Sequence, residues 1–124
     1  MANPNIVNVA TIYGNTSSTS LSTTSATSIV NNAAGSGKVY KINAIVVANV
    51  DGASAADISI NVYSEDDLGG TSYALASTIA VPADASLIVV DKSTSFYLLE
   101  DQSIGAVAGT AGDLVVTASW EQIS

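Results

Sequence analysis

Cysteine, histidine and arginine are all absent from this sequence of 124 residues. Without cysteine there can be no disulfide framework and no thiolate metal site. Without histidine the chain lacks both the commonest general base and the commonest metal ligand. We therefore expect no catalytic residue, no metal site and no cofactor, and we expect the protein not to be an enzyme.

Positive charge is scarce, and the charges are unevenly placed along the chain. The lysines are Lys38, Lys41 and Lys92, against eleven acidic residues, which gives a net charge of −8. Residues 1–50 contain two lysines and no acid, whereas residues 51–124 contain one lysine and all eleven acids. A chain with this balance repels nucleic acid and anionic membranes, so we expect neither as a partner.

Long apolar runs are also missing. No stretch approaches the roughly 18 apolar residues that a membrane-spanning helix needs. The first residues, MANPNIVN, have no basic start and no apolar h-region, so we expect no signal peptide and synthesis in a cytoplasm. The Ser/Thr/Ala/Gly-rich composition is more typical of extracellular particles, which favours a component of a virion.

Residues 38–50, KVYKINAIVVANV, carry the clearest pattern in the chain. Apolar residues recur with a period of two and β-branched types are frequent, which predicts a strand. One expected face consists of Tyr40, Ile42, Ala44, Val46, Ala48 and Val50. The other face is only partly polar, so we expect this strand to be central and covered on both sides.

The remaining chain reads as short strands separated by turns. About eight strands with turn signals every eight to twelve residues indicate an all-β fold, a single antiparallel β-sandwich of jelly-roll or Ig-like type. We divide this one domain into residues 1–15, an N-terminal arm or first strand; residues 16–37, a Ser/Thr-rich link or edge strand followed by a loop; and residues 38–124, the sandwich core.

Three local patterns suggest chemistry, and each has a simpler interpretation. The run Gly35 to Lys38 lacks two positions of the phosphate-binding loop and leads into a strand, so a flexible turn is favoured. The run Glu65 to Asp67 could bind calcium weakly, but a solvated turn is favoured. Tyr63 lies on a polar parity and could form a sugar platform, whereas Tyr40, Tyr73, Phe96 and Trp120 are expected in the core.

Protein contact is the remaining use for the uncharged N-terminal residues. The predicted contact residues are Ile6, Val7, Val9, Ile12, Tyr13, Lys38 and Lys41. An uncharged apolar arm can add as a strand to the sheet edge of a neighbouring protein. The alternative, that the arm is the domain's own first strand, stays open at this point.

Several short motifs carry a family resemblance that covers roughly residues 36–124. They are Lys41-Ile42-Asn43, Val81-Pro82-Ala83, Leu87 to Val90, Tyr97-Leu98, Glu100-Asp101, Ser103-Ile104 and Ser119-Trp120-Glu121. In these motifs the chain resembles small virion structural proteins of tailed bacteriophages, especially those that infect marine cyanobacteria. The motifs are strand and turn features rather than catalytic ones.

The resemblance implies a non-enzymatic part of a virion, most simply a head decoration (cement) protein that binds the outer shell and bridges capsid subunits. The expected partners are the major capsid protein or other virion proteins, together with further copies of the chain, for which a trimer is plausible. The expected location is the virion. A neck, tail or fibre component is the first alternative, and a glycan-binding adhesion domain is the second.

Overall fold

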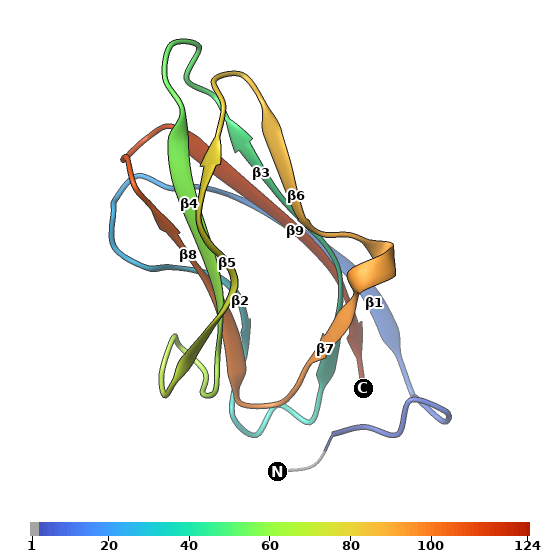
Figure 1. The fold of residues 1–124 in the computed structure, drawn as a ribbon. Helices are drawn as coiled ribbons and strands as arrows, with labels where there is room; N and C mark the ends of the chain where they lie inside the picture. Colours follow the sequence, from blue (N-terminus) through green and yellow to red (C-terminus); the bar gives the residue numbers. More distant parts are fainter. Residues whose placement is uncertain (1–2) are drawn as a thin grey trace.

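Two antiparallel sheets face each other in the protein, shown by a computed structural model that describes residues 3–124 (Figure 1). The first sheet contains five strands and the second contains four. In chain order the elements are β1 (Ile12–Ser20), β2 (Thr27–Asn32), β3 (Val39–Asn49), β4 (Ala56–Tyr63), β5 (Ser72–Val81), β6 (Ser86–Val90), η1 (Lys92–Thr94), β7 (Phe96–Leu98), β8 (Gln102–Ala108) and β9 (Leu114–Ile123). The all-β antiparallel sandwich predicted from the sequence is confirmed.

The order of the strands identifies the type of sandwich. One sheet runs β1-β9-β3-β6, with β7 also pairing with β3, and the other runs β2-β8-β4-β5. Because β6 and β7 both pair with β3 on either side of the short helix η1, they act as one interrupted strand. When β6 and β7 are counted as one strand, each layer has four strands. Along most of the chain, successive strands alternate between the two layers. This is a jelly roll rather than an Ig-like sandwich.

The helical content of the described residues is the single 3-10 turn η1. Its N-cap Asp91 accepts hydrogen bonds from the backbone N–H groups of Ser93 and Thr94, at 2.9 and 3.2 Å. Hydrogen bonds that the carboxylate of Asp91 accepts, first from the hydroxyl of Ser93 and then from its backbone N–H, hold the pKa of Asp91 below its usual value. Nowhere in residues 3–124 is a helix long and apolar enough to cross a membrane.

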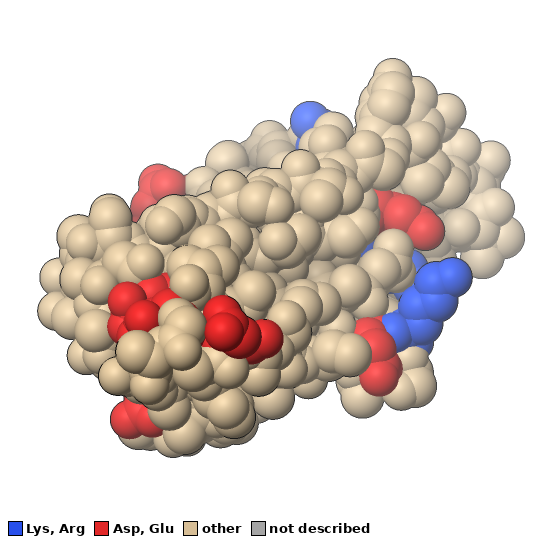
Figure 2. Space-filling view, turned by 90° about the horizontal axis from the view of Figure 1, so that it is seen from above, with Lys and Arg blue, Asp and Glu red and all other residues tan. Residues whose placement is uncertain are grey.

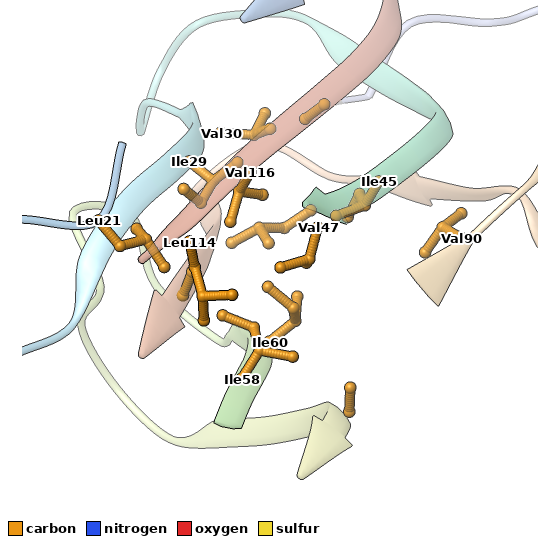
Figure 3. Close-up of a cluster of buried hydrophobic side chains, with 14 of the residues drawn as sticks. Leu21, Ile29, Val30, Ile45, Val47, Ile58, Ile60, Val90, Leu114 and Val116 are labelled. Carbon is orange, nitrogen blue, oxygen red and sulfur yellow. The ribbon is translucent and has the colours of Figure 1, made fainter. Parts of the chain in front are cut away.

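The core lies between the two sheets and is built mainly from β-branched residues (Figure 3). Its fully buried side chains include Ile42, Ile45 and Val47 from β3. They belong to the same buried cluster as Ile58 and Ile60 from β4. Burying a side chain of this size contributes roughly 1.5–3 kcal/mol, so this interface supplies most of the stability of a chain without disulfides.

Strand β3 is central, as predicted, with β9 on one side and β6 and β7 on the other. Its expected faces are wrong in detail. Ile42 is buried, but the next buried residues are Ile45, Val47 and Asn49, not Ala44 and Val46. The register with β9 shifts between Ile42 and Ala44, so one extra residue enters β3 there. A β-bulge of this kind exchanges the two faces of the strand beyond it.

The Ser/Thr-rich run is part of an edge strand. Strand β1 pairs with β9 in an unbroken register from Ile12 opposite Ile123 to Ser20 opposite Val115. The residues before it are tied to the same sheet, because the N–H groups of Ala10 and Thr11 donate to the carbonyl of Ser124 at 2.7 and 3.1 Å. The end of the predicted arm therefore belongs to the domain's own first strand, while residues 1 and 2 lie outside the described part.

Strand β5 departs most from the sequence-based expectation. Tyr73, expected in the core, is 64% exposed, and Leu75 and Ile79 are 42% and 40% exposed. Strand β5 forms the edge of its sheet, and its register with β4 shifts twice. These shifts break the alternation, so that only Ala76 and Val81 of this strand are buried. Tyr40, Phe96 and Trp120 do pack against the core, although each remains partly exposed.

Candidate functional site

An apolar pocket of about 240 Å³ lies where the N-terminal segment crosses the outer side of the five-stranded sheet. Its lining residues are Asn3, Pro4, Ile6, Val39, Tyr97 and Leu99. We call this the arm pocket. Val39 lies three residues before the core residue Ile42, so a strand period of two turns its side chain away from the core. The N-terminal segment buries it there to 3% exposure.

The N-terminal segment is held by a few polar contacts. The Oδ1 atom of Asn3 accepts a hydrogen bond from the backbone N–H of Glu100 at 3.3 Å. A turn follows, in which the N–H of Asn8 donates to the carbonyl of Asn5 at 3.1 Å. This turn leaves Val7 92% exposed and Ile6 52% exposed. Apolar side chains are therefore presented to solvent on a short, uncharged loop.

The predicted contact residues fall into two groups in the structure. Ile6 lines the arm pocket beside Val39, which is adjacent in sequence to the partly buried Lys38. Lys41 belongs to the same face, because it lies opposite Tyr97 in the pairing of β3 with β7. Val7 lies in the turn next to Ile6, and Val9 is partly buried.

Ile12 and Tyr13 form the second group, at the start of β1. They are 56% and 58% exposed, and β9 separates their strand from β3. Tyr97 and Leu99 were not among the contact residues predicted from the sequence. The sequence does contain a signal for these two residues. Phe96 to Leu99 are all apolar, and alternate residues of a strand point to opposite faces, so two of the four side chains face away from the core.

The uneven charge along the sequence does not divide the molecule into an acidic and a neutral half. Strands β1, β2 and β3 from the neutral part are distributed over both sheets, and each pairs with a strand from the acidic part. Figure 2 shows one group of acidic side chains at one end of the visible face and further acidic side chains beside the lysines toward the other end. The acids lie mostly in the loops at both ends of the sandwich, and the strands of the sheets are nearly uncharged.

The acidic loop at residues 65–67 is tied to its neighbours. Asp66 accepts a hydrogen bond from the N–H of Ala34 at 3.0 Å, and Asp67 exchanges two with the side chain of Asn31, at 2.8 and 3.0 Å. The N–H of Asp66 donates to Asp101 at 3.1 Å. Within residues 3–124 no group of three or more acidic side chains is placed to hold a metal ion.

The glycine-rich loop at residues 35–37 binds a carboxylate of the chain itself. The N–H groups of Gly35 and Gly37 donate to the two oxygens of Glu100, at 3.2 and 2.9 Å. Both glycines have positive φ angles, 75° and 67°, which turn their N–H groups toward a common acceptor. The loop is therefore fixed by Glu100 rather than free, and its anion-binding groups are occupied.

The ring of Tyr63 packs against the neighbouring strand rather than projecting into solvent. A Cβ atom built on Gly105 would lie 3.0 Å from the ring of Tyr63, so this ring covers the neighbouring strand β8. The most exposed aromatic rings are those of Tyr73 and Tyr13, which lie in edge strands of different sheets. Tyr63 is therefore poorly placed as a sugar platform, and the glycan-binding alternative stays a prediction.

Comparisons with known proteins give no sequence family: no family model and no curated protein matches the chain. Among solved structures, Bacillus endospore appendages, described as disulfide-linked pili, align over 92% of this chain and 88% of theirs, with 18% identity and a TM-score of 0.49. A structure of infectious bursal disease virus, Gx strain, aligns over 93% of this chain, with 14% identity and a TM-score of 0.40.

The virus comparison involves only 31% of the length of the viral chain. At such low identities and TM-scores, neither likeness assigns a family or a function to this chain. The present sequence contains no cysteine, so it has no counterpart to the disulfide linkage named for the pili. The functional interpretation therefore depends on the surface of the molecule itself.

Proposed function

We propose that the protein is a non-enzymatic structural component of a bacteriophage virion, a decoration protein that binds the outer capsid shell through the arm pocket. The observation that supports this most directly is the convergence of Ile6, Val39, Tyr97 and Leu99 on one outer face of the sandwich. Lys41 borders that face. An apolar depression, bordered by Lys41 and by Glu121 opposite it on β9, suits a neighbouring protein surface better than solvent.

The exposure of individual side chains agrees with a docking role. Val7 at 92%, Tyr97 at 43% and Leu99 at 39% exposure all lie in or beside the segments that form the arm pocket. A subunit bound there would cover these apolar groups and gain the corresponding hydrophobic free energy. The acidic loop at residues 65–67 lies at the same end as the arm pocket. Asp51 and Asp84, in the β3–β4 and β5–β6 loops at the opposite end (Figure 1), would remain in solvent and help to keep the particle soluble.

The fold is compatible with this role but does not select it. Jelly rolls occur in viral capsid proteins and also in lectins and enzymes, so the support from the fold is an analogy. The major capsid protein is the proposed partner. A component of the neck, tail or fibre would use the same kind of surface, and the number of copies distinguishes these possibilities.

The first test is the copy number of the protein in purified virions of the virus that encodes it. Quantitative mass spectrometry would compare it with the major capsid protein. A copy number on the order of that of the shell subunits supports decoration, whereas about a dozen copies per virion indicate the neck, tail or fibre. Absence from the particle would overturn the proposal of a virion component altogether.

The second test examines the arm pocket. We expect Leu99→Asp to abolish binding to particles stripped of this protein, because it places a charge in an apolar contact. Ile88→Asp is the matched control, since Ile88 is a 63% exposed residue of β6 outside the pocket. Equal binding of both variants and the unaltered protein would remove the arm pocket as the contact.

A further inference from the structure

Strand β1 presents an unusually open sheet edge. It is nine residues long, contains no proline and no charged residue, and pairs with β9 without any shift in register. Proteins usually protect an edge strand with charge, proline, a bulge or a short length, because its unpaired backbone groups can pair with another chain. Strand β1 has none of these protections.

The other three edges of the sandwich are protected. Strand β2 has six residues and a register shift between Ser28 and Val30. Strand β5 has two shifts relative to β4 and a positive φ of 49° at Thr78. Strand β6 has five residues and ends at η1. The open edge is therefore a property of β1 and not a general feature of this fold.

The hydrogen-bond pattern shows which residues of β1 face outward along the edge. At one end Thr11 and Ser124 exchange two backbone hydrogen bonds, and at the other end the N–H of Leu21 donates to the carbonyl of Leu114. In an antiparallel ladder such pairs alternate. The odd-numbered residues therefore bond to β9. The even-numbered ones, Ile12, Gly14, Thr16, Ser18 and Ser20, direct their backbone groups to the free edge.

Two residues on the inward side of β1 have unpartnered polar atoms. Among the described residues, the Nδ2 atom of Asn15 and the Oγ atom of Ser17 are buried and make no hydrogen bond. Buried polar atoms without a partner are rare and costly. Asn15 and Ser17 are placed symmetrically about Thr16, which is also the midpoint of β1.

We propose that β1 pairs antiparallel with β1 of a second copy of this chain, across a two-fold axis at Thr16. Full overlap of the two strands requires Ile12 opposite Ser20 and Thr16 opposite Thr16. The same register places Asn15 of each copy opposite Ser17 of the other. The length of the strand and the positions of the unpartnered atoms thus lead independently to the same register. In this register all five outward-facing residues of each strand find backbone partners.

The charges permit this pairing despite a net charge of −8 per copy. Strand β1 is uncharged, and the only acid on β9, Glu121, lies opposite Gly14. In the proposed register Gly14 faces Ser18 of the second copy, whose β9 neighbour is Thr117. No carboxylate is then opposite another across the new ladder.

The pairing predicts a dimer, in contrast to the trimer suggested by the family resemblance, and it does not depend on the proposed capsid role.

The test uses single cysteines, since the chain has none of its own. In the proposed register the two copies of Thr16 have Cα atoms about 5.5 Å apart, within disulfide reach. Thr16→Cys should therefore form a covalent dimer under mild oxidation. Ser18→Cys is the matched control, because the two copies of Ser18 would be about 14 Å apart. We expect it to remain uncrosslinked.

A second measurement does not depend on the cysteine variants. Sedimentation of the unaltered protein should show a dimer that is lost in Thr16→Lys, which places like charges opposite each other at the axis, and kept in Ser119→Lys. Ser119 lies beside Thr16 but one strand further from the edge. A monomer at every concentration, a trimer, or crosslinking of Ser18→Cys in preference to Thr16→Cys would overturn the proposal.

Discussion

The ring of Tyr40 in β3 stacks on the indole of Trp120 in β9, with ring centroids 6.0 Å apart and ring planes inclined by 26°. The two residues are diagonal neighbours, because Trp120 lies opposite Ile42 and Tyr40 lies opposite Gln122. They close one part of the core where the bulge in β3 begins. Burial of Tyr40 raises the pKa of its hydroxyl above the usual value, since the ionised form is poorly solvated there.

The raised pKa of Tyr40 predicts a loss of stability in alkali. Above about pH 10 the unfolded chain releases this proton before the folded protein does, so the free energy of unfolding falls as the pH rises. Below that pH the contribution is fully present. We expect Tyr40→Phe to lose less free energy between pH 9 and pH 11 than the unaltered protein, measured by urea unfolding. Parallel pH curves for the two proteins would contradict this assignment.

Asn49 connects three segments at one end of the sandwich. Its Nδ2 atom donates to the carbonyls of Ser54 and Val81, each at 2.9 Å, and its Oδ1 atom accepts from the N–H of Asp51 at 2.9 Å. The residue is 3% exposed. We expect Asn49→Ala to lower the free energy of unfolding by about 2–4 kcal/mol, because the buried carbonyl of Val81 loses its partner and the part-buried contact with Ser54 is lost as well.

Asn5→Ala is a suitable control for that experiment, since Asn5 is exposed and its side chain accepts only one local hydrogen bond, from the N–H of Val7. It should change the midpoint of denaturant unfolding very little. If both variants unfold at the same denaturant concentration, Asn49 is not a structural tie between the loops.

Gly105 lies against two neighbouring side chains that would have to shift to admit a methyl group. An added Cβ atom would lie 2.7 Å from Leu68 Cδ2 and 3.0 Å from Tyr63 Cε2. Gly105→Ala should destabilise the protein by about 1–3 kcal/mol, the typical effect of overpacking. Gly14→Ala is the matched control, because nothing lies within 4 Å of its added methyl group. Thermal unfolding should separate the two variants by several degrees.

The sequence predicts the architecture well because the sandwich depends on a repeated pattern. The alternation in residues 38–50 identifies a strand that does lie inside one sheet, paired on both sides. The faces of β3 could not be predicted, because the bulge between Ile42 and Ala44 depends on its fit to β9 and leaves no local signal. Likewise, the exposure of Tyr73 follows from the position of β5 at a sheet edge.

The candidate site was predicted only in part for a similar reason. Ile6 and Lys41 were selected because an uncharged arm and the few lysines stand out in the composition. Tyr97 and Leu99 were missed because their contact with the N-terminal segment joins residues more than 90 positions apart. The Ser/Thr-rich run has no apolar alternation, and only its pairing with β9 makes it a strand.

Ser17 and Ser18 are neighbours in β1 for which we predict opposite effects of the same substitution. The Oγ atom of Ser17 is buried without a partner, whereas that of Ser18 shares a hydrogen bond of 3.0 Å with Thr117 on the outer face. In dilute solution, where the chain is a monomer, Ser17→Ala should raise the free energy of unfolding by about 1 kcal/mol. Ser18→Ala should lower it by about 0.5 kcal/mol.

In the dimer the order of the two serine variants reverses. Ser17→Ala removes the group proposed to meet Asn15 of the second copy, so it should weaken dimerisation several-fold, by sedimentation equilibrium. Ser18→Ala retains the backbone groups that form the edge ladder, and its dimer should be unchanged within about two-fold. A Ser17→Ala variant that is less stable as a monomer and dimerises normally would show that the Oγ atom has a partner within its own subunit.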